Sequence, residues 1–477
     1  MFDTFAGLDH VHFVGIGGSG MSGIAEILLG YRRLRVSGCD RAASAVTERL
    51  EGLGVTVHVG HDEAHLDGVD LVVKSSAVPD DNPEIQAARA RGITVVRRAE
   101  MLGELMRLKY GIAVAGTHGK TTTTSLIGTL LTEAGLDPTV IVGGRMRVSG
   151  TGARIGQSHY LVAEADEFDR SFLRLMPILA VVTSIDSDHL DTYRDLDAIR
   201  EAFFDFATRV PFFGAVILCL DDDNNQRMLP RLAGHRVITY GLSPQADLCA
   251  RDVEATPDGC TFVVHSMRDG RLGPVALPMP GQHNVQNALA AVAVGLALEL
   301  PFSAIAEALA RFGGVHRRFE RIGSFGGAAV VDDYAHHPTE IEATLRAARQ
   351  AFPHGRVHAI FQPHLYSRTR DLGAEFGRAL MLADRAWVAP IYASREAPIA
   401  GISADTVIDA ARASGHRHVE RCDDWAAMPT TLAGAVAAQD VVLTLGAGDI
   451  VRLGQQIAAS DADALRAAAG SREEAKP

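Results

Sequence analysis

Short apolar runs alternate along the chain with longer segments whose apolar residues recur every three or four positions, over most of its 477 residues. The short runs are typical of buried strands, and the periodic segments are typical of amphipathic helices. Regular alternation of the two predicts an α/β fold in which helices cover mainly parallel sheets.

The alternation falls into three blocks, which is expected because 477 residues exceed what one ordinary core accommodates. The clearest apolar segments are residues 10–16, 35–40 and 70–77 in the first block, 111–116, 160–166 and 179–186 in the second, and 321–334, 356–363 and 440–449 in the third. We therefore predict three domains: a Rossmann-like domain at 1–109, a central P-loop-like domain at 110–316, and a second Rossmann-like domain at 317–477.

The first apolar run leads directly into G-x-G-x-x-G, formed by Gly15, Gly17 and Gly20. A helical segment follows, and Asp40 stands at the end of the next predicted strand. Glycines allow a tight turn and close backbone approach to a diphosphate, whose charge a helix N-terminus stabilises. The motif predicts a diphosphate site, and these residues alone leave NAD and a nucleotide sugar open as its ligand.

A second glycine loop, G-x-x-G-K-T, follows the strand at 111–116 and comprises Gly116, Gly119, Lys120 and Thr121. The usual nucleotide-binding loop has four residues between its glycines, and here there are two. Its physical parts remain: exposed backbone N–H groups, a lysine for the β- and γ-phosphates, and a hydroxyl for Mg²⁺. A chance G-K-T is the alternative, and the order strand, turn, helix favours a phosphate site.

Acidic stretches follow two further predicted strands and contain Glu164 and His189. Because the carboxyl ends of parallel strands meet at one edge of a sheet, these side chains can converge on a metal ion beside Thr121. The alternative is a solvated helix start, where acidic residues are favoured. For Glu164 we favour the ligand role, and for His189 the two alternatives stay even.

Composition narrows the function classes. The net charge of −12 gives no reason to expect nucleic acid as a partner, and 47% hydrophobic with 22% charged residues is typical of a folded protein. The N-terminus lacks the pattern of a signal peptide, and the longest apolar run, 288–298, is too short to span a bilayer. The five cysteines form no C-x-x-C pair. We expect a cytoplasmic protein without membrane insertion, as a monomer or a weak homodimer.

The motifs, taken in order, resemble the Mur ligases of peptidoglycan synthesis over nearly the whole chain. The matching stretches are GIGGSGMSGIAE (15–26), SSAVPDDNPE (75–84), RRAEML (97–102), AGTHGKTTTT (115–124), EADEFDRSF (164–172), SDHLDTY (187–193), PGQHNVQNALAA (280–291), HRRFE (316–320), DDYAHHPTE (332–340), FQPHLYSRTRDL (361–372) and LGAGDI (445–450). Many stretches in the right order are far more specific than any one of them.

The resemblance implies a reaction and its cofactors. ATP phosphorylates the carboxylate of UDP-N-acetylmuramate, and the amine of L-alanine attacks the acyl phosphate, with Mg²⁺ as the metal and Mn²⁺ as a substitute. The implied ATP-binding residues are Gly116, Thr117, His118, Gly119, Lys120, Thr121, Thr122, His283, Asn284, Asn287, Arg318 and Asp333. Metal ligands would be Thr121, Glu164 and His189.

The resemblance also places the two other substrates. Tyr334, His336 and Arg368 would surround the alanine, with Arg368 on its carboxylate and His336 as the candidate general base. The implied UDP-substrate residues are Gly15, Gly17, Gly18, Ser19, Gly20, Met21, Ser22, Asp40, His61, Ser76 and Arg97. Lys120, Glu164, His189, His336 and Arg368 are the candidate catalytic residues. Since these residues fall in different predicted domains, we expect the domains to close on binding.

Departures from the family pattern concern three positions: Leu365 stands where a basic residue is usual, and Asp186 with Ser187 replaces a commoner sequence before His189. The alternative within the family is the recycling ligase that attaches murein tripeptide to UDP-N-acetylmuramate. Two alternatives from other classes are an NAD-dependent oxidoreductase and a nucleotide-binding regulator without catalysis. Binding of NAD(H) or of a UDP-sugar to the first block would separate the oxidoreductase from the ligases.

Overall fold

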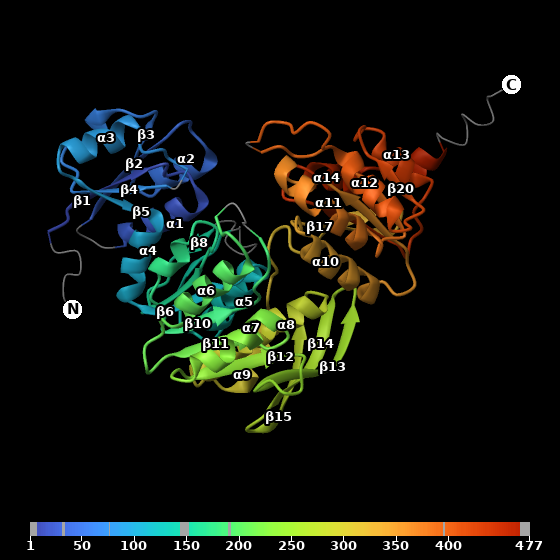
Figure 1. The fold of residues 1–477 in the computed structure, drawn as a ribbon, viewed down its shortest axis with the longest axis horizontal. Coiled ribbons are helices and arrows are strands. Elements are labelled where there is room, and N and C mark those ends of the chain that lie inside the picture. Colours follow the sequence, from blue (N-terminus) through green and yellow to red (C-terminus); the bar gives the residue numbers. More distant parts are fainter. Residues whose placement is uncertain are drawn as a thin grey trace. The chain divides into compact units, whose positions relative to one another are not determined.

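The computed structural model describes residues 7–30, 34–75, 77–143, 152–188, 192–394 and 396–467. Within them the strands form three sheets, of five, ten and six strands (Figure 1). The chain divides into two compact units. The first comprises Met1–Arg251, Val263–Val275 and Gln286–Gly313, and the second comprises Asp252–Phe262, Ala276–Val285 and Gly314–Pro477.

The first sheet is parallel and has the order β3-β2-β1-β4-β5. Its elements are β1 His10–Val14, α1 Ser19–Leu29, β2 Arg35–Asp40, α2 Ala45–Gly52, β3 Thr56–Val59, η1 Glu63–Leu66, β4 Leu71–Lys74, α3 Pro83–Ala90, β5 Thr94–Arg97 and α4 Arg98–Arg107. All of β1 is buried, and the strand order reverses between β1 and β4. Doubly wound sheets bind ligands at such a reversal, and the first glycine motif leaves β1 there.

The second sheet has the order β15-β14-β13-β12-β11-β10-β6-β9-β7-β8. Its elements are β6 Tyr110–Ala115, α5 Lys120–Glu133, β7 Thr139–Ile141, β8 Ala153–Arg154, β9 Tyr160–Glu164, η2 Ser171–Arg174, β10 Leu179–Val182, α6 Leu196–Ala207, β11 Ala215–Cys219, α7 Asp223–Met228, η3 Leu229–Leu232, β12 Val237–Gly241, β13 Leu248–Thr256, β14 Gly259–Ser266, β15 Gly270–Leu277, α8 Gln282–Ala297 and α9 Phe302–Ala310. β6 is parallel to both of its neighbours, β9 and β10. Val114 is paired with Glu164 and Ala115 with Val182, so the second glycine loop starts where both neighbouring strands end.

The third sheet has the order β16-β17-β21-β18-β19-β20, and β16 alone of these strands is antiparallel to its neighbour. Its elements are β16 Glu320–Phe325, β17 Ala328–Asp333, α10 Pro338–Ala351, β18 Val357–Phe361, α11 Tyr366–Leu380, β19 Arg385–Val388, α12 Ala404–Ala413, β20 Val419–Arg421, α13 Met428–Ala433, β21 Val441–Leu445 and α14 Val451–Ala459. The apolar segment 321–334 is a hairpin that turns at Gly326 and Gly327, both with positive φ.

The inner strands β17, β18 and β21 of the third sheet are buried along their whole length, which explains why their apolar residues do not alternate with polar ones. Successive residues of β17 pack into different cores, Val330 into one and Val331 into the other. Ile360 and Phe361 of β18 divide in the same way. In the part of the chain that the structure describes, no helix has the length and apolarity to cross a membrane.

Candidate active site

The second glycine loop connects the buried strand β6 to α5. Gly116 has φ +142° and Gly119 has φ +81°, conformations that L side chains rarely adopt. Gly119 caps α5 without a side-chain hydrogen bond. A Cβ on Gly119 would lie 2.6 Å from Asn287 Oδ1, so a side chain would also collide with α8. The loop is therefore a tight turn with an open helix N-terminus, which suits an anion.

The only lysine of this loop is held at its centre. Lys120 Nζ donates to the carbonyl oxygens of Gly116 (2.6 Å) and Thr117 (3.1 Å) and pairs with Glu167 at 2.9 Å. Burial by itself lowers the pKa of Lys120, but the carboxylates of Glu167 and Asp166 raise it above its ordinary value. The amine is thus a fixed cation next to the helix N-terminus, where a β- or γ-phosphate would need it.

A hydroxyl and a carboxylate meet beside the lysine and fit a hard cation. Thr121 Oγ1 donates to Glu164 Oε1 at 3.1 Å, and Glu164 Oε2 accepts from the Gly143 N–H at 2.8 Å. Oxygen ligands of this kind are those that Mg²⁺ prefers. The third predicted metal ligand, His189, lies outside the described residues. Thr122, which was predicted to bind ATP, is buried next to Thr121.

The far side of the loop is tied to the segment after β10. Thr117 N donates to Ser184 O at 2.8 Å, and Asp186 N donates to Thr117 Oγ1 at 2.9 Å. His118 Nε2 lies 3.2 Å from Asp186 Oδ2. Asp186, one of the departures from the family pattern, therefore contacts the phosphate loop directly.

Two of the predicted ATP-binding residues, Asn284 and Asn287, contact other parts of the protein. Asn287 Oδ1 accepts from Thr123 Oγ1 at 3.1 Å, which ties α8 to α5. Asn284 Nδ2 donates to Pro280 O at 2.8 Å, within its own turn. Contact of these two residues with ATP stays a prediction.

The first glycine loop is fixed by Asp40. Gly15 has φ +84°, and the Gly17 N–H donates to Asp40 Oδ2 at 2.8 Å. Gly18 caps α1 without a side-chain hydrogen bond, and the side chains of Met21 and Ser22 are buried. Their backbone N–H groups donate to Gly18 O at 3.0 and 2.9 Å, so contact of these two residues with a ligand stays a prediction. Ser76 and the side chain of Ser19 lie outside the description.

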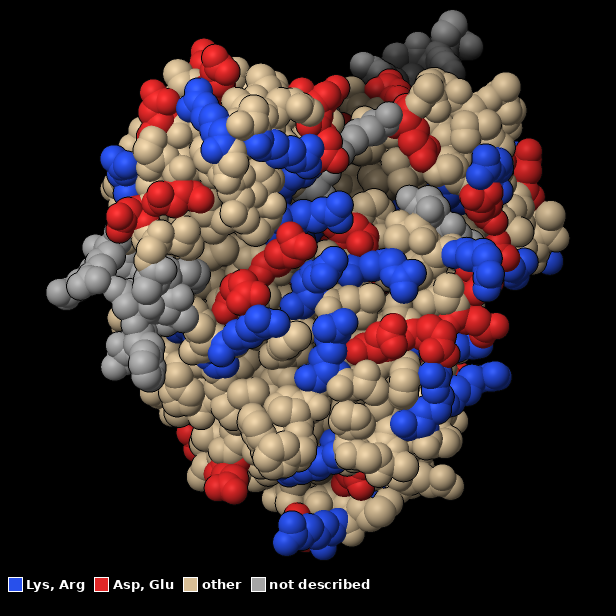
Figure 2. Space-filling model, turned by 60° about the vertical axis from the view of Figure 1, so that its left-hand side comes forward, with Lys and Arg blue, Asp and Glu red and all other residues tan. Residues whose placement is uncertain are grey.

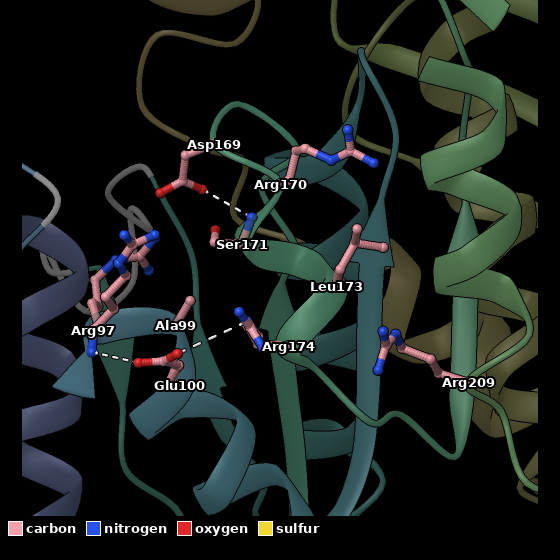
Figure 3. Close-up of a pocket in the computed structure, with 10 residues that line it drawn as sticks. Arg97, Ala99, Glu100, Asp169, Arg170, Ser171, Leu173, Arg174 and Arg209 are labelled. Carbon is pink, nitrogen blue, oxygen red and sulfur yellow. Dashed lines mark hydrogen bonds and ion pairs between the residues drawn. The ribbon is translucent and has the colours of Figure 1, made fainter. Parts of the chain in front are cut away.

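A pocket lined by five arginines lies between α4 and η2, within the same unit. Its volume is about 320 Å³, and its arginines are Arg97, Arg98, Arg170, Arg174 and Arg209 (Figure 3). Glu100, which accepts from the Arg97 N–H at 2.9 Å, is one of two carboxylates that line the pocket. A Cβ on Gly20 would lie 2.9 Å from Arg98 Nη1, so the pocket adjoins the first glycine loop.

The charge of this pocket suits an anionic substrate. Figure 2 shows many basic side chains on the face that it displays, with acidic side chains between them. Arg97 was the one arginine of the set predicted from the sequence. Arg98 and Arg170 lie in family stretches but were given no role, and Arg174 and Arg209 lie outside them. The convergence of these arginines depends on how α4 and η2 pack together, which the sequence does not show.

In the second unit, Asp333 and Arg318 stand at the ends of the β16–β17 hairpin. Asp333 accepts from the N–H groups of Phe319 and Ala335, both at 2.8 Å. Burial raises the pKa of Asp333 to about 6, although the positive charge of Arg318 acts to lower this pKa. Burial, followed by the charge of Arg318, lowers the pKa of His283 to about 4. The structure thus brings these three predicted nucleotide residues together.

The predicted amino-acid residues also lie together in this unit. Burial lowers the pKa of His336 to about 4. The carboxylate of Glu340 acts to raise this pKa, and the positive charge of Arg368 acts to lower it. His336 Nδ1 lies 3.0 Å from Tyr334 O, so this nitrogen carries the proton and Nε2 is free of one. The rings of Tyr334 and His336 meet edge to face at 5.2 Å. His336 is therefore a neutral imidazole at pH 7, which can accept a proton.

Leu365, one of the departures from the family pattern, has φ +70° and is the N-cap of α11, the helix that carries Arg368, so the backbone is strained where this helix begins.

Glu167, in the first unit, pairs with Lys120 and was missed by sequence reasoning although it lies three residues after Glu164. Its burial in an acidic stretch could not be foreseen from the pattern.

Family models match three successive parts of the chain: the catalytic domain of the Mur ligase family over residues 10–110, the Mur ligase middle domain over 114–295, and the Mur ligase glutamate ligase domain over 317–448. Curated relatives cover nearly all of it. The UDP-N-acetylmuramate–L-alanine ligase of Syntrophotalea carbinolica is 52% identical over 94% of this chain and 97% of its own. The ligase of the same name from Geobacter sulfurreducens is 50% identical over 96% and 99%.

Solved structures of Mur ligases have the same fold as this chain. The UDP-N-acetylmuramate–alanine ligase of Thermotoga maritima has a TM-score of 0.76 at 29% identity, covering 94% of this chain and 98% of that one. A murein peptide ligase from Psychrobacter arcticus has a TM-score of 0.64 at 25% identity, with the same coverage. The predicted three-domain α/β fold is confirmed, while its limits after residues 109 and 316 stay a prediction. The chain belongs to the Mur ligase family, whose motifs its sequence carries from the first glycine loop to the third sheet.

Proposed function

We propose that this chain is an ATP-dependent ligase that joins the amine of L-alanine to the carboxylate of UDP-N-acetylmuramate. The observation that carries the proposal is the shortened glycine loop after β6, with Lys120 paired to Glu167 and Thr121 bonded to Glu164. Relatives that share half of its residues over nearly its whole length bear the name of this ligase. We place the reaction in the cytoplasm, carried out by a monomer or a weak homodimer.

In the first step a carboxylate oxygen attacks the γ-phosphorus and ADP leaves. The open N-terminus of α5 binds the phosphates, and Lys120 neutralises negative charge as it shifts to the leaving oxygen. Thr121 and Glu164 would hold Mg²⁺, which neutralises further charge on the phosphates when bound. Glu167 keeps the Lys120 amine in place until the nucleotide arrives.

In the second step the amine attacks the acyl carbon and phosphate leaves. Arg368 would bind the carboxylate of alanine through its planar guanidinium, which orients the amine. His336 Nε2 would accept the proton that the amine loses, since its Nδ1 proton is already engaged by Tyr334 O.

The UDP-linked substrate is assigned to the first glycine loop and the pocket beside it. The N-terminus of α1 would receive the diphosphate, and Arg97 with the other pocket arginines would attract its negative charge. Murein peptide ligases share the fold and are the second candidate within the family.

The test is phosphate release from ATP and Mg²⁺ with UDP-N-acetylmuramate, run in parallel with L-alanine, with murein tripeptide and without an amine. Release that requires L-alanine is the expected result. Release with tripeptide alone would assign the chain to the recycling ligases. No release with either amine would favour a regulator or an oxidoreductase, and NAD(H) binding would then distinguish these two.

A further inference from the structure

Four potential metal ligands from four different elements meet in the first sheet's domain, away from the ATP loop. They are His12 of β1, Cys39 of β2, His65 of η1 and Glu84 of α3. One ligand atom from each lies within 4.8 Å of all the others. His12 and Glu84 have no exposed side-chain surface, Cys39 is buried, and His65 is 15% exposed.

The contacts among these groups centre on one carboxylate. Glu84 Oε2 lies 3.0 Å from His12 Nε2 and accepts from Cys39 Sγ at 3.0 Å. Glu84 Oε1 lies 2.9 Å from His65 Nδ1. In a tetrahedral zinc site, ligand atoms are about 3.3 to 3.8 Å apart, given bonds of about 2.0 to 2.3 Å. Small outward shifts of the side chains would therefore make room for one ion.

A chain of hydrogen bonds fixes which nitrogen of His12 faces the carboxylate. His10 Nδ1 lies 3.1 Å from Gly68 O, which can only accept, so this nitrogen carries a proton. His10 Nε2 lies 2.7 Å from Ser37 Oγ. Ser37 Oγ also lies 2.8 Å from His12 Nδ1, so the hydroxyl links the two rings.

The consequence concerns His12 Nε2. This nitrogen faces Glu84 Oε2 at 3.0 Å, while Nδ1 of the same ring lies 2.8 Å from Ser37 Oγ. Histidines that ligate a metal typically donate their other N–H to a fixed acceptor, and Ser37 Oγ occupies that position beside His12 Nδ1.

The other ligands also have supporting contacts. The His65 ring stacks on His58, with centroids 4.0 Å apart and an interplanar angle of 8°. Glu84 Oε1 accepts from the Asp62 N–H at 3.0 Å. His61 Nδ1 lies 3.3 Å from Cys39 Sγ, and its side chain is 20% exposed, so the cluster is reachable from that side.

We propose that His12, Cys39, His65 and Glu84 bind one Zn²⁺ ion. Two imidazoles, a thiolate and a carboxylate form the mixed donor set that Zn²⁺ favours over Mg²⁺. Since the protein would supply four ligands, the site is a closed structural one that joins β1, β2, η1 and α3. When the ion binds, Glu84 exchanges its hydrogen bonds to the other three ligands for a bond to the metal, and the Cys39 thiol releases its proton. The inference does not depend on the proposed ligase activity.

The experiment is a titration of the full chain with Co²⁺, after removal of metals and of any affinity tag, in the absence of ATP. One equivalent should produce intense visible absorption, typical of tetrahedral Co²⁺, and a near-ultraviolet thiolate charge-transfer band. Zn²⁺ should then abolish both. Oxygen ligands at the ATP loop cannot produce the thiolate band.

Variants identify the ligands. Cys39→Ser should lose the charge-transfer band, and Glu84→Gln should weaken Co²⁺ binding at least tenfold. Cys422→Ser, at an equally buried cysteine of the other unit, should retain the full spectrum. Persistence of the band in Cys39→Ser, or its loss in Cys422→Ser, would overturn the proposal. The unaltered chain decides the matter even where variants fail to fold, since absence of the band at several equivalents of Co²⁺ excludes the site.

Discussion

The loops after β1 and β6 invite comparison, because each leaves a parallel strand inside its sheet and enters a helix within a few residues. Each begins with a glycine of positive φ, +84° at Gly15 and +142° at Gly116. Each helix is capped by a glycine, Gly18 or Gly119, that makes no side-chain capping bond. The backbone therefore presents an anion site in both places.

The side chains around the two loops differ. At the first loop, Asp40 accepts from Gly17, and the neighbouring arginines lie in the pocket beside Gly20. At the second, Lys120 is held inside the loop, and Thr121 meets Glu164 at its edge.

This difference separates holding a phosphate from transferring one. Backbone N–H groups and a helix terminus bind a diphosphate without further help. Phosphoryl transfer also requires a cation that follows the shifting charge and a site for a metal. The comparison teaches that the glycines alone do not reveal which loop is catalytic, whereas the residues at the start of the helix do.

Replacing the lysine should test the comparison most severely. Lys120→Ala removes the one cation within the second loop, and we expect phosphate release to fall by about 10³-fold or more. Binding of UDP-N-acetylmuramate, measured by calorimetry without ATP, should be unchanged because the first loop is intact. Lys109→Ala is the matched control, since Lys109 Nζ donates to the Ser158 carbonyl. A variant within tenfold of the unaltered enzyme would contradict the assigned role.

The metal side of the second loop should give the next largest effect. Glu164→Gln retains the shape of the side chain but loses the charge beside Thr121. We expect kcat to fall by about 100-fold and the Mg²⁺ concentration for half-maximal rate to rise. Mg²⁺ titrations of phosphate release measure both. Glu133→Gln, at the exposed end of the same α5 helix, should behave like the unaltered chain. An unchanged Mg²⁺ requirement in Glu164→Gln would remove Glu164 from the metal site.

Much of the fold was predictable because local pattern and global architecture agree. The β1 and β6 strands stand out as apolar runs followed by glycine turns, and both were located from the sequence. The hairpin of β16 and β17 was not separated, because both strands are rich in small and apolar residues and only Gly326 and Gly327 mark the turn.

The candidate site was predictable where a residue belongs to a motif. Lys120, Thr121 and Glu164 lie together as expected. Glu167 belongs to a motif too, but nothing in that acidic stretch distinguishes it as the buried partner of Lys120. Arg174 lies outside the motifs, and its position depends on how the chain after β9 packs on α4. The pairing of His12 with Glu84 joins residues seventy-two positions apart, for which a single sequence offers no signal.

The first loop should respond to a single methyl group. A Cβ on Gly17 would lie 2.8 Å from Asp40 Oδ2, so Gly17→Ala must displace that carboxylate. We expect KM for UDP-N-acetylmuramate to rise by about tenfold, equal to about 1.4 kcal/mol of binding, while KM for ATP stays constant. Gly52→Ala is the control in the same domain, because nothing lies within 4 Å of its added Cβ. Equal changes in both KM values would mean that the two loops are not independent.

The smallest effect is expected at Asp40 itself. Both of its oxygens accept backbone N–H groups at 2.8 Å, Oδ2 from Gly17 and Oδ1 from Arg41. Asp40→Asn offers one oxygen, so one of these two N–H groups loses its acceptor and the other loses a charged partner. The loop is then held less firmly in the geometry that binds the substrate, at a cost of about 1 kcal/mol of binding free energy. This loss would raise KM for UDP-N-acetylmuramate by about fivefold, with kcat nearly unchanged. Asp67→Asn, which affects only an exposed ion pair with Arg91, is the control. Should kcat fall instead while KM holds, Asp40 would act on the reaction itself, and the first loop would do more than hold its ligand.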